Sequence, residues 1–156
     1  MELKGEFYVW DKSEPQTHIS NHFTTKEMAC KCTFKECREQ KIAKELIDRL
    51  EKLRDATKDP IRVHSAYRCS AYQAHLRNQG VSTVVAKKSQ HEEGKAVDVS
   101  SSALTSKALE KLASLYFKSI GLASNFLHLD LRDDKVRRWD YGVGTGAIGK
   151  DAPKMR

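Results

Sequence analysis

Apolar residues recur at helical spacing in two stretches of the chain. The stripe within residues 38–57 has lysine, glutamate, aspartate and arginine on its opposite face. Its apolar members are Ile42, Leu46, Ile47, Leu50 and Leu53. The second stripe follows a serine-rich turn (residues 100–102) and ends near Gly121. Its members are Leu104, Ala108, Leu112, Leu115 and Tyr116. Both stripes predict amphipathic helices that pack one face on a core.

Strand-like alternation appears in three other places. Asp59-Pro60 ends the first helix and begins a strand over residues 61–68. One face of that strand carries Ile61, Val63, Ser65 and Tyr67, and the other carries Arg62, His64, Ala66 and Arg68. Residues 96–99 alternate as a half-buried strand does. In residues 125–132 three leucines alternate with Phe126, His128, Asp130 and Arg132. Such a strand buries its leucines and builds either a salt-bridged surface or a site on its other face.

Capping signals place two shorter helices. Thr24 and Glu27 form a capping box, which predicts a short helix before the first cysteines. Ser70 and Gln73 form a second box, which predicts a helix to about Gln79 with Gly80 as its C-terminal cap. Residues 81–90 then read as a polar loop.

The two ends of the chain are weakly patterned. Residues 1–22 form an N-terminal extension, in which residues 6–10 are either an edge strand or a segment that packs an aromatic ring onto the body. His18 and His22 lie there, and we do not expect them to bind a metal. Four glycines after Tyr141 predict a loop-like tail (residues 142–156). The whole pattern predicts one α+β domain, residues 1–156, in which a small antiparallel sheet packs against several helices.

Composition narrows the classes of partner. Lysine and arginine number 28 against 21 acidic residues, a net charge of +7, which favours a polyanionic neighbour. Such a neighbour would be nucleic acid, a membrane surface or an anionic cell wall. The basic residues are spread along the chain, without an aromatic RNA-binding motif or zinc-finger spacing, so nucleic acid is the weaker candidate. A mean hydropathy of −0.64 and short apolar runs predict a soluble protein without a membrane span. We expect a monomer.

The first residues bear on where the protein acts. They lack a basic segment followed by an apolar one, so the sequence predicts no secretory signal and synthesis in the cytoplasm. If such a protein acts outside the cell, something else must release it.

Four cysteines, Cys30, Cys32, Cys37 and Cys69, leave three states open. Their spacing suits a metal cluster with Cys69 as the fourth ligand, although it is not a standard zinc-finger spacing. Buried thiols are an equal alternative. A disulfide would require an oxidising destination.

The chemistry-bearing stretch runs from Ser89 to Asp98. It places His91 in a loop and Asp98 on the strand that the loop enters, with Gly94 between them. Nitrogen plus carboxylate is ligand chemistry for zinc, and a catalytic zinc takes three protein ligands and keeps an open position. His128, on the polar face of a later strand, is the third candidate ligand.

These motifs resemble a known family. Ser-x-His-x-x-Gly-x-Ala-x-Asp (residues 89–98), followed by Phe-Leu-His-Leu-Asp (residues 126–130), is similar to the zinc peptidases of bacterial cell-wall peptides. These are the D-Ala-D-Ala carboxypeptidases, phage endolysins and murein endopeptidases, related in fold to lysostaphin and the Hedgehog signalling domain. The resemblance extends over roughly residues 20–140, including residues 23–32, the long helix and residues 60–69.

The resemblance implies roles for individual residues. His91, Asp98 and His128 match the family's zinc ligands. Arg68 matches an arginine that holds the substrate carboxylate or polarises the scissile carbonyl, a task suited to a guanidinium. Ser89, which opens the motif, is a further predicted substrate-binding residue.

The proton acceptor is less clearly marked. Family members place a basic group two or three residues before the last ligand, where this chain has Asn125 and Phe126. Some murein endopeptidases share the present arrangement, and Asp130 is the candidate general base because it shares a strand face with His128. Its alternative role is to orient a ligand or to pair with Arg132. Glu92, Glu93 and His64 are further candidates for the general base.

The sequence thus predicts zinc-dependent hydrolysis of a peptide bond in the peptidoglycan stem, by carboxypeptidase or endopeptidase action in phage-type lysis. Two alternatives use the same fold without chemistry: a zinc-containing wall-binding module, and a structural component of a virion. The remaining alternative is a basic α+β domain in which His91, Asp98 and His128 are unrelated to one another.

Overall fold

The computed structural model describes residues 1–76, 78, 89–141 and 154–155, and it has the predicted α+β architecture. Two sheets form the body. The smaller has the order β1 (Glu2–Lys4), β2 (Phe7–Asp11), β3 (Glu39–Ala43). The larger has the order β4 (Ile61–Ser65), β5 (Ala96–Ser101), β7 (Leu127–Asp130), β6 (Ser119–Leu122), β8 (Arg137–Asp140), β9 (Lys154–Met155). The larger sheet is antiparallel except where β6 and β8 run parallel.

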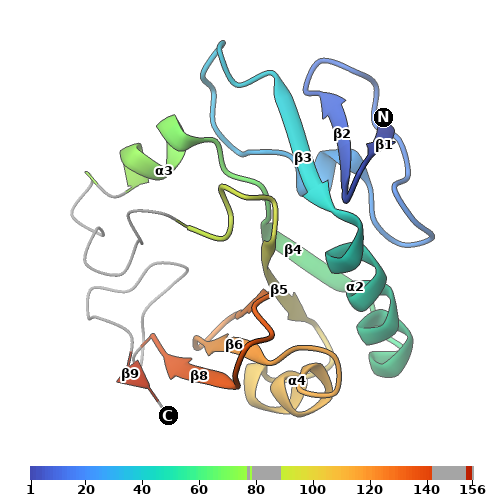
Figure 1. Cartoon of the computed structure of the whole chain (residues 1–156). Coiled ribbons are helices and arrows are strands. Elements are labelled where there is room, and N and C mark those ends of the chain that lie inside the picture. The colour runs from blue at the N-terminus through green and yellow to red at the C-terminus, as the bar shows by residue number, and fades with distance from the viewer. Residues whose placement is uncertain (77, 79–88, 142–153, 156) are drawn as a thin grey trace.

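The helices of the described chain are α1 (Thr25–Met28), α2 (Lys44–Thr57), α3 (Ser70–Leu76) and α4 (Ser106–Ala113). Figure 1 shows α2 leaving the end of β3, and α4 packs beside α2. The apolar stripe of α2 enters the core, where Leu46, Ile47, Leu50 and Leu53 are buried. Burial of that stripe joins the N-terminal sheet to the larger sheet through one apolar core. Among the described residues, no helix has both the length and the apolar character of a membrane span.

The first predicted helix begins later than expected. Residues 39–43 form β3 instead, because β2 supplies an antiparallel backbone partner, with Tyr8 opposite Ile42. Gln40 and Ile42, two residues apart in this strand, are buried, whereas Glu39 is exposed and Lys41 is half-buried. Ile42 therefore belongs to a strand face and not to the helical stripe. The edge-strand alternative for residues 6–10 is also corrected, since β2 is the middle strand of its sheet.

The second predicted helix is shorter than its apolar stripe. α4 begins after Thr105, whose side chain accepts a hydrogen bond from the Ala108 backbone, and it ends at Ala113. The chain then turns into β6, which includes Gly121. A Cβ at Gly121 would lie 2.5 Å from the Trp139 indole, so the space taken by that ring explains the glycine that we interpreted as a helix end.

The capping predictions had different outcomes. The Thr24–Glu27 box is present and begins α1. The Ser70 hydroxyl instead donates to Glu92 at 3.2 Å, and Gln73 accepts from Arg68. At the start of α3 the Cys69 sulfur accepts from the Tyr72 backbone. The expected end of that helix at residues 79–80, most of the loop 81–90 and nearly all of the tail 142–156 lie outside the described residues.

The remaining strands differ in extent from their predictions. β4 ends at Ser65, after a register irregularity between Val63 and Ser65, so Arg68 follows the strand. β5 continues to Ser101, where a turn was expected. β8 was not predicted, because its residues lie in the charged stretch that follows β7.

Candidate metal site

Strand pairing brings two of the three predicted ligands together. Asp98 on β5 and His128 on β7 are direct antiparallel partners, so their side chains project from the same face of the sheet. His128 Nδ1 lies 3.1 Å from Asp98 Oδ1. Both residues are buried. Two positions thirty residues apart thus become neighbours through register alone.

His91 reaches the same point from the turn that precedes β5. Its Nε2 lies 3.4 Å from Asp98 Oδ1. Ser89 tightens the turn, because its hydroxyl oxygen accepts from the His91 backbone N–H at 3.1 Å. Gly94 has a φ of +69°, and a Cβ there would lie 2.9 Å from the Lys41 carbonyl oxygen. The glycine between the two ligands is therefore required by both conformation and space.

The hydrogen-bond partners of the imidazoles define which nitrogens are available. His91 Nδ1 lies 2.6 Å from the Ala66 carbonyl oxygen, which can only accept, so Nδ1 carries the proton and Nε2 keeps its lone pair. His128 Nε2 lies 2.8 Å from a carboxylate oxygen of Asp130, so Nε2 is the donor there. The nitrogen of His128 that faces Asp98 is Nδ1.

This donor set suits zinc. One atom from each of His91, Asp98 and His128 lies within 4.8 Å of the others. Two imidazole nitrogens and a carboxylate oxygen, with no fourth ligand among the residues that the structure describes, match catalytic zinc sites. Each histidine also donates its other N–H to a carbonyl or carboxylate oxygen, the usual support of a metal-bound histidine. The residues therefore fit the metal that the sequence predicted.

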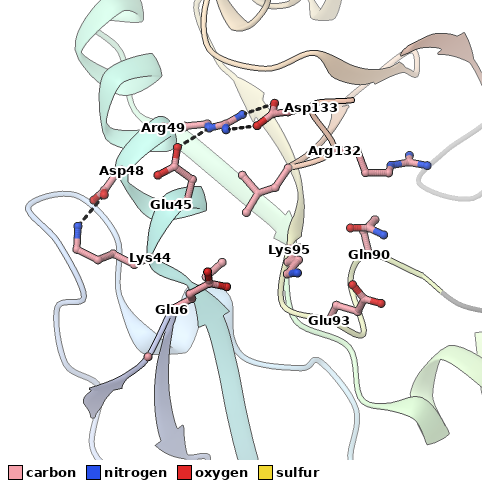
Figure 2. Close-up of a pocket in the computed structure, with 13 residues that line it drawn as sticks. Glu6, Lys44, Glu45, Asp48, Arg49, Gln90, Glu93, Lys95, Arg132 and Asp133 are labelled. Atoms are coloured by element: carbon pink, nitrogen blue, oxygen red, sulfur yellow. Dashed lines mark hydrogen bonds and ion pairs between the residues drawn. The ribbon is translucent and has the colours of Figure 1, made fainter. Parts of the chain in front are cut away.

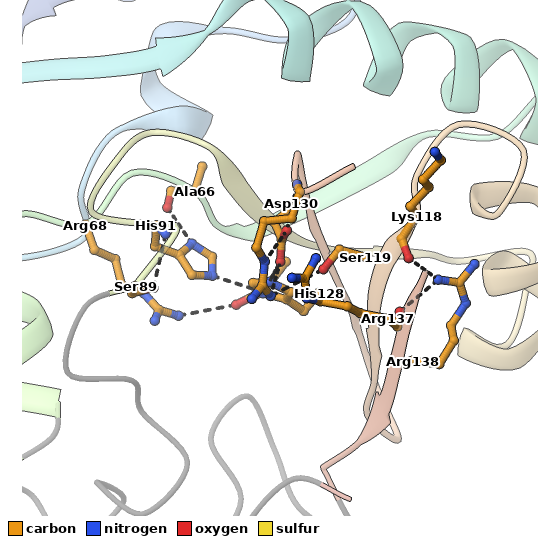
Figure 3. A network of polar contacts seen from close by, with 12 residues as sticks. Ala66, Arg68, Ser89, His91, Lys118, Ser119, His128, Asp130, Arg137 and Arg138 are labelled. Carbon is orange, nitrogen blue, oxygen red and sulfur yellow. Dashed lines mark hydrogen bonds and ion pairs between the residues drawn. The ribbon is translucent and has the colours of Figure 1, made fainter. Parts of the chain in front are cut away.

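Arg68 lies against the far side of Asp98. Its Nη2 donates to Asp98 Oδ2 at 3.2 Å, its Nε to Ser65 Oγ at 3.0 Å and its Nη1 to Gln73 Oε1 at 3.3 Å. The side chain is buried, and these three contacts hold the guanidinium in one orientation. Figure 3 shows Arg68, His91 and His128 pointing toward one another.

The buried titratable groups of the site shift one another's pKa values. Burial by itself would raise the pKa of Asp98, but His91 and His128 outweigh burial and hold that pKa well below its usual range. Burial would lower the pKa of His128, yet hydrogen bonds to Asp130 and Asp98 raise it to about 9. For His91, burial and then the charge of Arg68 lower the pKa. The two imidazoles therefore differ in basicity because their partners differ.

Asp130 lies on the side of His128 that faces away from Asp98. It contacts His128 Nε2 and accepts two hydrogen bonds from the Arg132 guanidinium, each at 2.9 Å. Its side chain is fully buried. This is the geometry of the orienting alternative that the sequence left open, and the base assignment stays a prediction.

The further candidates for the general base have partners of their own. Glu92 accepts from the Ser70 hydroxyl. His64 Nε2 lies 2.7 Å from Ser100 Oγ, and burial, followed by the charge of Arg62, lowers its pKa. Glu93 lines a separate hollow between α2, the turn at residues 90–95 and residues 131–133 (Figure 2).

The charged groups of that hollow are largely paired with each other. Arg49 contacts Asp133 at 2.6 Å and Glu45 at 3.0 Å, and Lys44 contacts Asp48 at 2.7 Å. None of the three metal-type residues lines the hollow. The hollow is therefore separate from the candidate metal site.

Two aromatic residues at the site were missed by sequence reasoning. The Trp139 ring lies 5.4 Å from the His128 ring, and Tyr141 packs against Trp139 and Phe126. Burial raises the pKa of Tyr141, and the charge of Asp98 raises it further. The Trp-x-Tyr spacing of these residues is typical of one face of a strand and could have predicted β8. The charged residues before it lack strand alternation, so no strand was expected there.

Comparison with known proteins agrees with this geometry. The model of a family described as peptidase M15 matches residues 21–130, which include all three metal-type residues and Arg68. No curated protein and no solved structure matches the chain.

Proposed function

The chain belongs to the peptidase M15 family, and we propose that it is a zinc-dependent peptidase that hydrolyses a bond in the peptidoglycan stem peptide. One observation carries the proposal. The hydrogen bonds of His91 and His128 leave one nitrogen of each facing the same oxygen of Asp98. A buried trio of this kind has the donors of a catalytic zinc site.

The residues around that trio have separable tasks. Zinc held by His91, Asp98 and His128 would supply Lewis-acid chemistry and the activation of water. Arg68, held by Ser65 and Gln73, presents its Nη2 at the site and binds a substrate carboxylate or carbonyl oxygen. Ser89 orders the turn that carries His91 and borders the substrate.

Asp130 acts as a positioning residue in this proposal. Its contact with His128 Nε2 fixes the ring orientation, and Arg132 keeps its carboxylate charged. His64 remains a further candidate for the proton acceptor, since it lies on β4 next to β5 and its Nε2 contacts Ser100 Oγ at 2.7 Å.

The test is mass analysis of muropeptides released from purified peptidoglycan by the full chain, with and without a chelator. We expect new termini that disappear with the chelator and in the His91→Ala variant, while the His18→Ala variant, which changes an exposed histidine elsewhere, keeps full activity. Hydrolysis that persists in His91→Ala would overturn the proposal. The masses of the products identify the bond, and thus distinguish carboxypeptidase from endopeptidase action.

A second candidate function is a zinc-containing wall-binding module without turnover. The engagement of Asp130 by His128 and Arg132 favours it, because it removes the first candidate base from the site. Sedimentation with peptidoglycan, without new amino or carboxyl termini, would support this module. In either case we propose action at the cell wall, after release or within a virion, as in phage-type lysis. Recovery of the protein from purified virions separates these two settings.

A further inference from the structure

A second cluster of metal-type side chains lies outside the site described above. The Sγ atoms of Cys30, Cys32, Cys37 and Cys69 all lie within 4.8 Å of one another. Three of these cysteines come from the segment between α1 and β3, and the fourth follows Arg68 just before α3. Three are buried and Cys69 is partly exposed. Folding thus gathers four thiols from distant parts of the chain.

The sulfur spacing matches a tetrahedral metal site. Cys69 Sγ lies 3.8 Å from Cys30 Sγ and 3.8 Å from Cys32 Sγ. Four sulfurs at about 2.3 Å from a central zinc form a tetrahedron with edges of about 3.8 Å. A disulfide requires a sulfur separation of about 2.05 Å, and Cys69 favours neither of its two neighbours. The arrangement therefore suits four ligands of one ion better than two covalent pairs.

Hydrogen-bond donors lie close to the sulfurs of the four cysteines. The Lys12 ammonium lies 3.5 Å from Cys32 Sγ, and Gln40 Nε2 lies 3.3 Å from Cys37 Sγ. Backbone N–H groups of Cys69 and Tyr72 each donate to a cysteine sulfur at 3.4 Å. Four thiolates around one divalent cation keep a net negative charge, which an ammonium and N–H donors stabilise. This shell is what a tetrathiolate site requires.

We propose that Cys30, Cys32, Cys37 and Cys69 bind a structural zinc ion, which ties the segment before β3 to the segment that carries Arg68. A closed set of four protein ligands holds structure and leaves no open position for chemistry. This zinc is distinct from the one at His91, Asp98 and His128, and the inference does not depend on peptidase activity.

The contacts of residues 67–69 show what this zinc would hold in place. The Tyr67 N–H donates to the Met28 carbonyl at 3.1 Å, two residues before Cys30. The Arg68 N–H donates to the His91 carbonyl at 3.1 Å. The segment thus has the cysteine cluster on one side and the turn of His91 on the other. Loss of the cysteine-bound zinc would loosen Arg68 through its own backbone.

The first test is metal content of the full chain purified under reducing conditions with zinc. The two clusters predict two zinc ions per chain, one in Cys32→Ser, one in His91→Ala and none in the double variant. Thr33→Ala, an exposed neighbour in the same segment, should keep both ions. Equal zinc content in the wild type and Cys32→Ser would overturn the inference, as would disulfides found by alkylation and mass analysis.

A second measurement covers the case in which Cys32→Ser does not fold. Cobalt added to the wild-type and His91→Ala proteins should give a thiolate-to-metal charge-transfer band in both, since only the cysteine cluster supplies sulfur. In the folded wild type, release of this metal by a thiol-specific mercurial should remove hydrogen-exchange protection from the amides of Tyr67 and Arg68. A cobalt spectrum without the charge-transfer band would contradict the site, and unchanged protection would contradict its link to Arg68.

Discussion

At the scale of single residues, each imidazole of the site is defined by the group behind it. His91 is held by a backbone carbonyl and His128 by a carboxylate. Burial and the charge of Arg68 lower the pKa of His91, whereas hydrogen bonds to Asp130 and Asp98 outweigh burial and raise the pKa of His128, so the second ring is the more basic of the two. Asp130 therefore influences the site through His128.

The Asp130→Asn variant tests this positioning role. We expect zinc affinity at the His91 site to fall by roughly 10–100-fold, because the ring keeps a weaker partner. Competition with a chromophoric chelator measures the affinity, and Asp134→Asn, which alters an exposed ion pair with Arg137, should change nothing. If hydrolysis were lost while zinc affinity stayed the same, Asp130 would instead be the proton acceptor.

At the scale of elements, the Trp139 ring of β8 occupies the space that a side chain at Gly121 of β6 would need. Gly121 on β6 leaves room for the Trp139 ring, which in turn packs on His128. The parallel pairing of these strands aligns Gly121 with Trp139 directly. A small residue in one strand thus positions an aromatic wall of the site.

The Gly121→Ala substitution should destabilise the fold by about 1–3 kcal/mol, since its Cβ would meet the indole at 2.5 Å. Urea unfolding measures the change. The same substitution in a Trp139→Phe background should cost less, because the smaller ring leaves space. Equal costs in the two backgrounds would show that the ring is not the obstacle.

The helix α2 provides a second prediction at this scale. Leu50 is fully buried in its stripe, so Leu50→Ala should cost about 2–5 kcal/mol of unfolding free energy through lost packing and a residual cavity. Leu115 is 69% exposed, and Leu115→Ala should change stability by no more than about 0.5 kcal/mol. Similar costs for the two variants would contradict the packing of α2 described above.

At the scale of the whole molecule, metal binding should contribute to stability. The buried trio places Asp98 beside two imidazoles, and an ion that binds only the folded chain stabilises it by mass action. Zinc at about 100 times its Kd should raise the Tm of the metal-stripped protein by roughly 5–10 °C. His91→Ala should show a smaller rise in the same calorimetric experiment. An equal rise in both proteins would place the stabilising zinc elsewhere.

Local patterns in the sequence by themselves determined several elements of the fold and the ligand motif. The helical stripe of α2, the alternation of β7 and the Thr24 capping box depend on neighbouring residues, and all three are present, although β7 is shorter than expected. The ligand motif was also visible, because residues 89–98 carry His91, Gly94 and Asp98 at close spacing. Such patterns are readable because their cause lies within one or two turns of chain.

Tertiary structure decided the features that depend on distant partners. Residues 39–43 became a strand because β2 offered hydrogen bonds, and residues 119–122 did so between β7 and β8. The place of Trp139 beside His128 follows from strand register, because Gly121 on β6 pairs with both residues. The gathering of Cys69 with three cysteines more than thirty residues earlier has the same origin. Nothing in a local pattern encodes which strands will pair, because that choice is made by the packing of the whole core.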